Sequence, residues 1–231
     1  RLIWFTSNKV LRCWYQHHKA LFSVSLLIAL CGLFLLSACQ SRVEAPPLPL
    51  PDLTVGVAPF TQPIQATELL AGFVPDPQGR IPAEALPELD DALAAKLNAT
   101  GRRYAFLQHN AVEGPLLQDE QGRRSALATW VQRARAADVD VLLVPQVLDW
   151  RERVGGTAGV LTPAAVVIDY FLVDARGDGT LLQRSHYAVQ QQSLASNLLG
   201  AKAFFQRKGK WVTAEELAAE SMDKAIKELG L

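Results

Sequence analysis

The run Asp140-Val-Leu-Leu-Val-Pro-Gln-Val-Leu-Asp149 decides the fold, because it is the most apolar stretch of the chain after residue 52. A short continuous run rich in valine and leucine is typical of a strand that is buried on both faces of a sheet. Pro145 cannot donate a hydrogen bond to a neighbouring strand, so we expect a bulge or an exposed edge there. The run therefore predicts a central strand.

Downstream of this run the sequence predicts a β-hairpin. Ala164–Val173 has the pattern of a strand, and Leu181–Gln192 has the pattern of a returning strand. Between them, Ala175-Arg-Gly-Asp-Gly-Thr180 carries the glycines and aspartate that tight turns need. Strands joined by so short a turn pair antiparallel.

Upstream, strands alternate with helices. We expect strands at Leu53–Phe60 and Arg103–Gln108, and helices at Leu86–Ala99 and Ser125–Ala137. A strand, a helix and a further strand pair parallel when the helix crosses back over the sheet. The first three strands are therefore predicted to be parallel.

The C-terminal segment predicts a capped helix. Thr213-Ala-Glu-Glu216 matches a capping box, in which Thr213 and Glu216 satisfy each other's backbone N–H groups. Shorter helices are expected near Thr67–Phe73 and Ser193–Gly200. Residues 53–231 thus predict a single α/β domain. Its mixed sheet of about five strands packs with three or more helices, in the order β-α-β-α-β-β-β-α.

Residues 1–38 have the three parts of a secretory signal peptide. Lys9, Arg12 and Lys19 supply positive charge, residues 1–43 contain no acidic side chain, and Ala20–Leu36 is apolar apart from two serines. An apolar run of about 17 residues is marginal for crossing a hydrocarbon core of ~30 Å. We therefore expect cleavage, with an uncleaved signal anchor as the alternative.

Leu36-Ser37-Ala38-Cys39 ends the apolar run and resembles the lipobox of bacterial lipoproteins. The resemblance implies cleavage before Cys39, a diacylglyceryl group on its thiol and a fatty acyl group such as palmitate on the new amino terminus. Several acyl chains together make a stable anchor. Enterobacterial lipoproteins with Asp after the cysteine stay in the inner membrane, so Gln40 implies the periplasmic face of the outer membrane.

Residues 39–52 are expected to be a lipidated cysteine followed by a spacer. Four prolines, Pro46, Pro47, Pro49 and Pro51, favour an extended and semi-rigid chain. Cys13 and Cys31 leave with the leader, and the lipid blocks Cys39. The mature chain is then expected to have no free thiol, no disulfide and no thiolate chemistry.

The charge balance argues against nucleic acid as a partner. The whole chain has 23 basic and 23 acidic residues. Cleavage removes four basic residues, Arg1, Lys9, Arg12 and Lys19, which leaves 19 basic against 23 acidic residues. Proteins that bind nucleic acid need a basic face, and this domain is mildly acidic.

Three segments carry a resemblance to a family. They are the first strand ending in Val57-Ala58-Pro59-Phe60, the Ala134–Val147 segment and the hairpin from Val166 to Gln190. Together they resemble the group of envelope lipoproteins that looks like the N-terminal domain of the Tol–Pal translocation protein. The group includes the curli-secretion, Pel-export and penicillin-binding-protein-activator lipoproteins. The resemblance implies a mostly non-enzymatic role in ring formation, synthase activation or polymer export.

No motif predicts catalysis, a metal or a cofactor. Neither His109 nor His186 has a second ligand at metal spacing in the sequence, so each is expected to be satisfied or solvated. Gly155-Gly156-Thr-Ala-Gly159 leads into a strand, whereas a phosphate cradle needs a helix behind it, so a flexible inter-strand loop is expected. Adjacent Asp90 and Asp91 are expected on a solvated helix face. Arg176-Gly177-Asp178 is expected to be a turn rather than an integrin motif.

Two clusters are candidate interaction sites. Aromatic and arginine side chains are enriched at interface hot spots, and basic groups meet anionic polymers or headgroups. The first cluster is Trp150, Arg151 and Arg153. The second is Phe204, Phe205, Arg207, Lys208, Lys210 and Trp211. Alternatively, Trp150 packs in the core, and Phe204 and Trp211 fix the last helix.

These observations predict a non-catalytic, lipid-anchored periplasmic protein that assembles with itself or with protein partners. It would serve polymer export or cell-wall synthesis, with polysaccharide or peptidoglycan as a further partner. One alternative is a lipid-tethered hydrolase of peptidoglycan or polysaccharide, which needs two carboxylates in one cleft; Asp149, Glu152 and Asp169 are the first candidates. Another is a periplasmic ligand-binding module.

Overall fold

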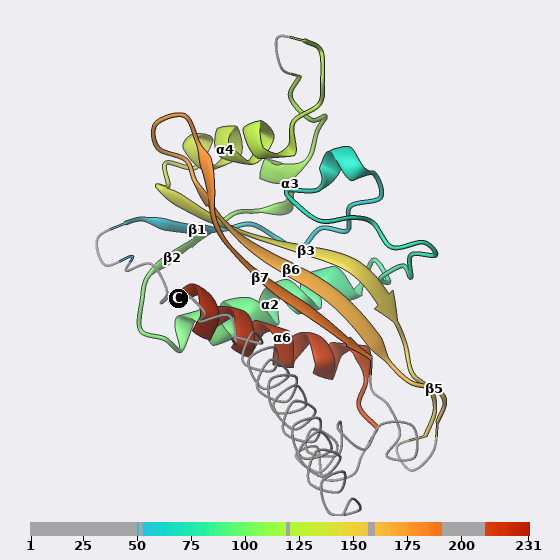
Figure 1. Ribbon diagram of the computed structural model, residues 1–231. Coiled ribbons are helices and arrows are strands. Elements are labelled where there is room, and N and C mark those ends of the chain that lie inside the picture. Colours follow the sequence, from blue (N-terminus) through green and yellow to red (C-terminus); the bar gives the residue numbers. More distant parts are fainter. Residues whose placement is uncertain (1–49, 51–52, 119–120, 157–159, 191–210) are drawn as a thin grey trace, which may run out of the picture. The chain divides into compact units, whose positions relative to one another are not determined.

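A computed structural model describes residues 50, 53–118, 121–156, 160–190 and 211–231. In its main sheet the strands lie in the order β2 (Tyr104–Phe106), β1 (Val55–Val57), β3 (Val141–Arg151), β6 (Ala165–Asp174) and β7 (Thr180–Gln190) (Figure 1). β1 pairs parallel with both β2 and β3, and β3, β6 and β7 pair antiparallel. The predicted mixed α/β sheet is confirmed, including the direction of each pairing.

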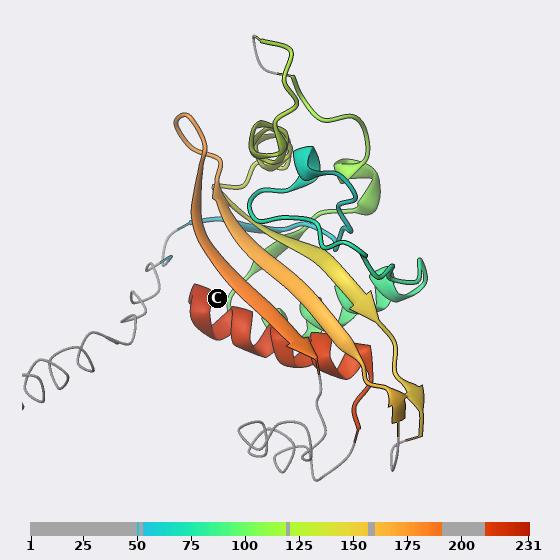
Figure 2. The ribbon, with the colours of Figure 1, turned by 45° about the vertical axis from the view of Figure 1, so that its right-hand side comes forward.

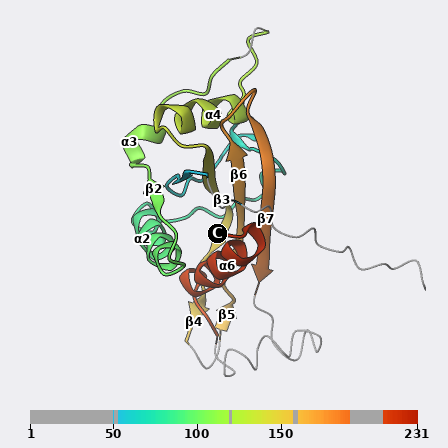
Figure 3. The ribbon, with the colours of Figure 1, turned by 90° about the vertical axis from the view of Figure 1, so that its left-hand side faces the viewer.

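Helices cover the two faces of this sheet. α2 (Ala85–Asn98) and α6 (Ala214–Leu229) pack together over one face, and α4 (Ala126–Ala136) packs over the other. Figures 2 and 3 show α4 apart from α6. Because β3 is covered on both faces, its side chains are buried from Val141 to Trp150. None of the helices in the described ranges is long and apolar enough to cross a membrane.

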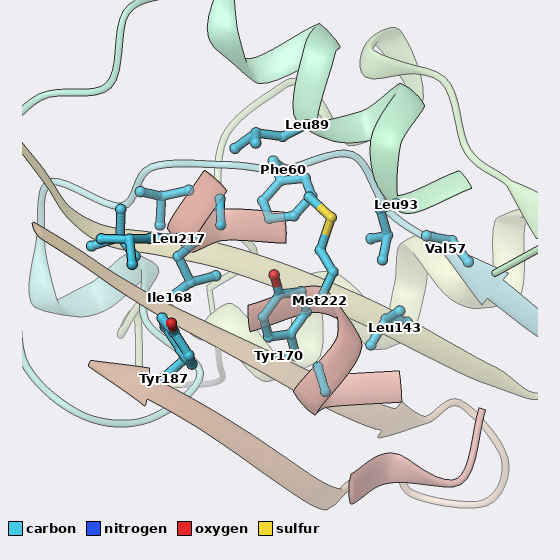
Figure 4. Packing of buried hydrophobic residues seen from close by; sticks show 14 of the residues in the cluster. Val57, Phe60, Leu89, Leu93, Leu143, Ile168, Tyr170, Tyr187, Leu217 and Met222 are labelled. Carbon is cyan, nitrogen blue, oxygen red and sulfur yellow. The ribbon is translucent and has the colours of Figure 1, made fainter. Parts of the chain in front are cut away.

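The core has one part on each face of the sheet. Val141 and Leu143 of β3 point toward α2 and α6, whereas Leu142 and Val144 point toward α4. The larger part, drawn in Figure 4, includes the edge-to-face contact of Phe60 with Tyr170, whose ring centroids are 5.9 Å apart. This alternation follows from the two-residue period of a strand.

Local signals set the ends of the helices. Ser125 caps α4 by accepting a hydrogen bond from the Ala128 N–H. Thr213 and Glu216 form the predicted capping box at the start of α6, and Gly230 ends that helix with φ of 69°. That left-handed conformation favours glycine, which lacks a Cβ.

Pro145 lies in a regular part of β3, and the bulge expected at the proline is absent from that strand position. Pro145 pairs with Tyr170, and the register shift of β3 lies between Val147 and Asp149. The irregularity occurs in the facing segment. Ala58 N donates to Leu143 O, but the next donor, to Pro145 O, is Thr61 N rather than Phe60 N. One extra residue thus lies opposite the proline, which has a carbonyl that accepts but no N–H to donate.

One local prediction needs correction, and two short features of the structure were not predicted. The helix expected at Thr67–Phe73 is only the 3-10 turn η1 (Ala66–Glu68), because the Glu68 carboxylate accepts from Ile64 N and Gln65 N and closes a turn. The loop after β3 contains a small hairpin of β4 (Val154–Gly155) and β5 (Val160–Thr162). A short helix not predicted, α3 (His109–Val112), follows β2. The helix expected at Ser193–Gly200 lies outside the described residues.

Candidate functional site

The first predicted cluster divides into a buried indole and an exposed cation. Trp150 is 2% exposed, belongs to the core, and donates from Nε1 to Glu152. Trp150 therefore packs in the core, as in the alternative interpretation of the first cluster. The Arg151 side chain is 50% exposed and forms an ion pair with Asp149, with Nη2 2.8 Å from Oδ2. At this end of β3, Arg151 therefore remains the cation that a partner could contact.

Arg153 connects the two predicted clusters. Its Nη1 donates to the backbone carbonyl of Trp211, which is half-buried just before α6. Arg153 and Trp211 thus meet although they lie far apart in the sequence. The remaining members of the second cluster, Phe204, Phe205, Arg207, Lys208 and Lys210, lie outside the described residues, as does Cys39.

Asp169 and Asp149, two of the acids considered as catalytic residues of a hydrolase, make contacts that hold the fold together. The Asp169 side chain is fully buried; its Oδ2 accepts from Arg184 at 2.7 Å, and its Oδ1 lies 2.6 Å from His186 Nδ1. Asp149 is also buried and accepts from Gly79 N at 2.6 Å and from Arg151. Because each carboxylate is held by its own arginine, these two do not form an acid–base pair.

Glu152 differs from these two acids. It accepts the indole N–H of Trp150, and partial burial raises the pKa of its carboxyl group while that hydrogen bond opposes the rise. We infer from this hydrogen bond that Glu152 holds the Trp150 ring in place.

A site that sequence reasoning missed lies where the parallel strands β1 and β2 end. A cavity of about 210 Å³ is lined there by Asp90 and Asp91 of α2, His109 of α3, and apolar residues that include Pro59 and Phe106. Ligands of open α/β sheets commonly bind at the carboxyl ends of parallel strands. Applied to the strands predicted at Leu53–Phe60 and Arg103–Gln108, this rule could have indicated the position of the cavity from the sequence.

Asp90 is held at this cavity by two donors. Its Oδ1 accepts from Phe60 N at 2.7 Å, and its Oδ2 lies 2.7 Å from His109 Nε2. Burial raises the pKa of Asp90, while the Phe60 N–H and His109 lower it in part. Asp90 is therefore not on a solvated face as expected, and with His109 it forms a pair that can hold or exchange a proton.

Other candidate motifs have structural explanations. The Arg176-Gly177-Asp178 segment is a turn in which Arg176 pairs with Asp174 at 2.8 Å and both Gly177 and Gly179 have positive φ. His186 and His109 each have an aspartate partner. Within the described ranges, no group of three or more His, Cys, Asp or Glu residues could hold a metal ion.

Comparisons with known proteins give structural likenesses only. No protein-family model matches the sequence, and no curated protein matches it. The PelC dodecamer from Paraburkholderia phytofirmans is 13% identical and has a TM-score of 0.43, with 76% of this chain and 86% of that chain covered. Lipoprotein GNA1162 from Neisseria meningitidis is 18% identical, with a TM-score of 0.35 and 68% and 96% covered.

The LpoB C-terminal domain from Salmonella enterica is a third similar structure. It is 12% identical with a TM-score of 0.31, and the match covers 60% of this chain and 83% of that domain. Identities and TM-scores this low carry no inference about function.

Proposed function

We propose that this chain is a non-catalytic, lipid-anchored accessory or assembly protein of the bacterial envelope, serving polymer export or cell-wall synthesis. The observation that carries the proposal is Leu36-Ser37-Ala38-Cys39, placed between an apolar run and a proline-rich spacer. Lipid on Cys39 would hold the α/β domain at the periplasmic face of the outer membrane. The exposed end of β3, with Arg151 and the Arg153–Trp211 contact, is where we expect a protein or polymer partner.

The contacts of the acidic residues support a non-catalytic role. Asp149 and Asp169 are buried and neutralised by Arg151 and Arg184, and therefore serve to hold the fold. A buried carboxylate kept in an ion pair is a poor proton donor or acceptor for a substrate.

Cys39→Ala tests the anchor directly. The variant should lose the lipid mass on intact-protein mass spectrometry and should leave the outer-membrane fraction, because the thiol is the attachment point. Cys31→Ala is the matched control, since it changes a cysteine of the apolar run and should leave both results unchanged. A Cys39→Ala protein that still carries the full lipid mass would rule out this anchor.

The same detergent extracts test self-assembly. Light scattering of the lipidated protein should give a mass of several subunits, and a strict monomer would contradict assembly of the chain with itself. Protein partners would then have to be sought by cross-linking in whole cells.

One observation favours a second candidate function, a lipid-tethered hydrolase acting on peptidoglycan or polysaccharide. Asp90 and Asp91 line one cavity together with His109, and the pKa of Asp90 is raised by burial. A general acid needs such a raised pKa. Purified protein incubated with labelled peptidoglycan should release no fragments under our proposal. Release that is lost in Asp90→Asn would support the hydrolase instead.

A further inference from the structure

A second cavity, of about 380 Å³, lies on the face of the sheet that α4 covers. It is bounded by α4, by the loop after α3 and by the segment that follows β1; these elements are labelled in Figure 1. Its lining includes Thr61, Glu68, Arg124, Trp130, Arg133 and Gln146, none of which lines the Asp90–His109 cavity. The volume falls in the range of small-molecule sites.

The cavity contains two guanidinium groups. Arg133 is fixed over the ring of buried Trp130, 4.7 Å from the centroid, and its Nη2 makes one long contact of 3.5 Å with Gly114 O. A guanidinium has five N–H donors, so most of those of Arg133 remain for a ligand. Arg124 is exposed and forms no ion pair with the residues that the structure describes.

The acid in the lining does not cancel this charge. Glu68 Oε2 already accepts from Ile64 N at 2.7 Å and from Gln65 N at 3.2 Å, which closes the turn of η1. Among the lining residues that the structure describes, two cations therefore face one carboxylate, and that carboxylate already accepts hydrogen bonds within η1. Burial lowers the pKa of Arg133, which reflects the cost of removing its charge from water. A bound anion would offset that cost.

The polar floor of the cavity is held in place by Gln146. The Gln146 side chain accepts from Leu70 N at 3.3 Å and donates to Glu68 O at 3.0 Å, so it cannot turn. The Thr61 Oγ1 is buried and has no hydrogen-bond partner among the described residues. Less than 1 Å² of this oxygen is accessible, so the guanidinium groups, rather than Thr61, are the donors open to a ligand.

We propose that this cavity binds a small organic anion, with Arg133 and Arg124 donating to its carboxylate or phosphate oxygens and Pro115 and Leu116 contacting its apolar part. The planar fork of arginine matches both oxyanions. Proline, leucine and valine side chains in the lining suit a short apolar body rather than a bare inorganic ion. The proposal is independent of the lipid anchor, because every residue named for the cavity belongs to the α/β domain of residues 53–231.

Calorimetric titration of the full-length lipidated protein in non-ionic detergent tests this. The probes are benzoate, phenyl phosphate and neutral benzamide, which share a ring and differ in the group attached to it. Both anions should bind saturably, and benzamide at least about tenfold more weakly, because only a charged group gains from the guanidinium donors. The stronger of the two anions identifies the oxyanion that the site prefers.

Variants locate the binding. Arg133→Gln and Arg124→Gln should each weaken anion binding about tenfold or more. Arg124 is exposed, so its variant keeps the fold even where Arg133→Gln disturbs the packing on Trp130. Arg123→Gln is the matched control outside the lining and should bind as the wild type does. Equal affinity for benzamide, unchanged affinity in Arg124→Gln, or no saturable binding of either anion at millimolar concentration would overturn the proposal.

Discussion

Asp140 and Thr54 clamp the starts of β3 and β1. Asp140 Oδ2 accepts from both the N–H and the hydroxyl of Thr54, each at 2.8 Å, and Thr54 Oγ1 accepts from Asp140 N at 2.9 Å. These bonds favour the ionised carboxylate, with the Thr54 N–H as the largest cause, and so hold the pKa of Asp140 below its ordinary value near 3.8. The parallel register of β1 on β3 begins at this clamp.

This clamp should make stability depend on pH. A carboxyl group whose pKa is lower in the folded state contributes stability above its unfolded pKa and loses it as pH falls through the folded pKa. Asp140→Asn should therefore lower the melting temperature at neutral pH, and the difference from wild type should shrink as the pH falls below about 3.8.

Asp138→Asn is the control for that experiment. Asp138 is exposed and has φ of 54°, a conformation that asparagine tolerates as well as aspartate does. Its melting curve should match wild type at every pH. A pH-independent effect of Asp140→Asn would show that the clamp does not act through the ionised carboxylate.

The segment between β1 and α2 is the element whose course was hardest to foresee. It is attached to the end of β3 at Gly79, whose N–H donates to Asp149 Oδ1 at 2.6 Å and whose carbonyl accepts from Trp150 N at 3.2 Å. Gln62 and Gln78 add hydrogen bonds to Gly79 O and Leu148 O. Most of these bonds join residues far apart in the sequence, so no local pattern indicated them.

Gly79→Ala should therefore be strongly destabilising. A Cβ at this position would lie 2.1 Å from the Trp150 carbonyl oxygen, a backbone atom that cannot move without breaking the attachment. We expect a loss of about 2–4 kcal/mol in the free energy of unfolding by urea. Gly156→Ala, where a Cβ meets no atom within 4 Å, is the matched control and should stay near wild type. Equal curves for the two variants would mean that the close approach at Gly79 is not maintained in solution.

At the scale of the whole domain, β3 and β6 belong to both parts of the core. Leu142 packs with the α4 side and Leu143 with the α2–α6 side, although they are neighbours in one strand. The Tyr170 hydroxyl of β6 lies 2.6 Å from Ser221 Oγ of α6, while Phe171 faces the opposite side. We therefore expect that loss of packing on one face of the sheet also destabilises the packing on the other face, because β3 and β6 contribute side chains to both.

Leu142→Ala and Leu143→Ala test this coupling. Each removes a buried side chain and should cost about 2–5 kcal/mol, and each should still unfold in one transition by near-UV and far-UV circular dichroism. Leu161→Ala, at a side chain 88% exposed, should change stability by less than about 0.5 kcal/mol. A separate early transition in Leu142→Ala would show that the α4 side unfolds on its own.

Much of the element order could be predicted because it depends on local patterns. The apolar run after Asp140, the glycines at Gly177 and Gly179 and the capping box at Thr213 each act within a few residues. The small hairpin after β3 and α3 were missed, since β4 has only two residues and α3 only four. Elements this short have no periodicity to detect.

The sequence by itself determined the order of the five main strands and the three long helices, and the buried position of β3. It also determined the resemblance of Cys39 to a lipid attachment site. Hydrophobic periodicity and short motifs are local properties, so no tertiary contact was needed for these predictions. Tertiary structure alone decided that Trp150 is buried, that Arg153 meets Trp211 and that Asp90 pairs with His109. It also brought Arg124 and Arg133 to one cavity. These are contacts between residues distant in the chain, and only the register and packing of the sheet bring such residues together.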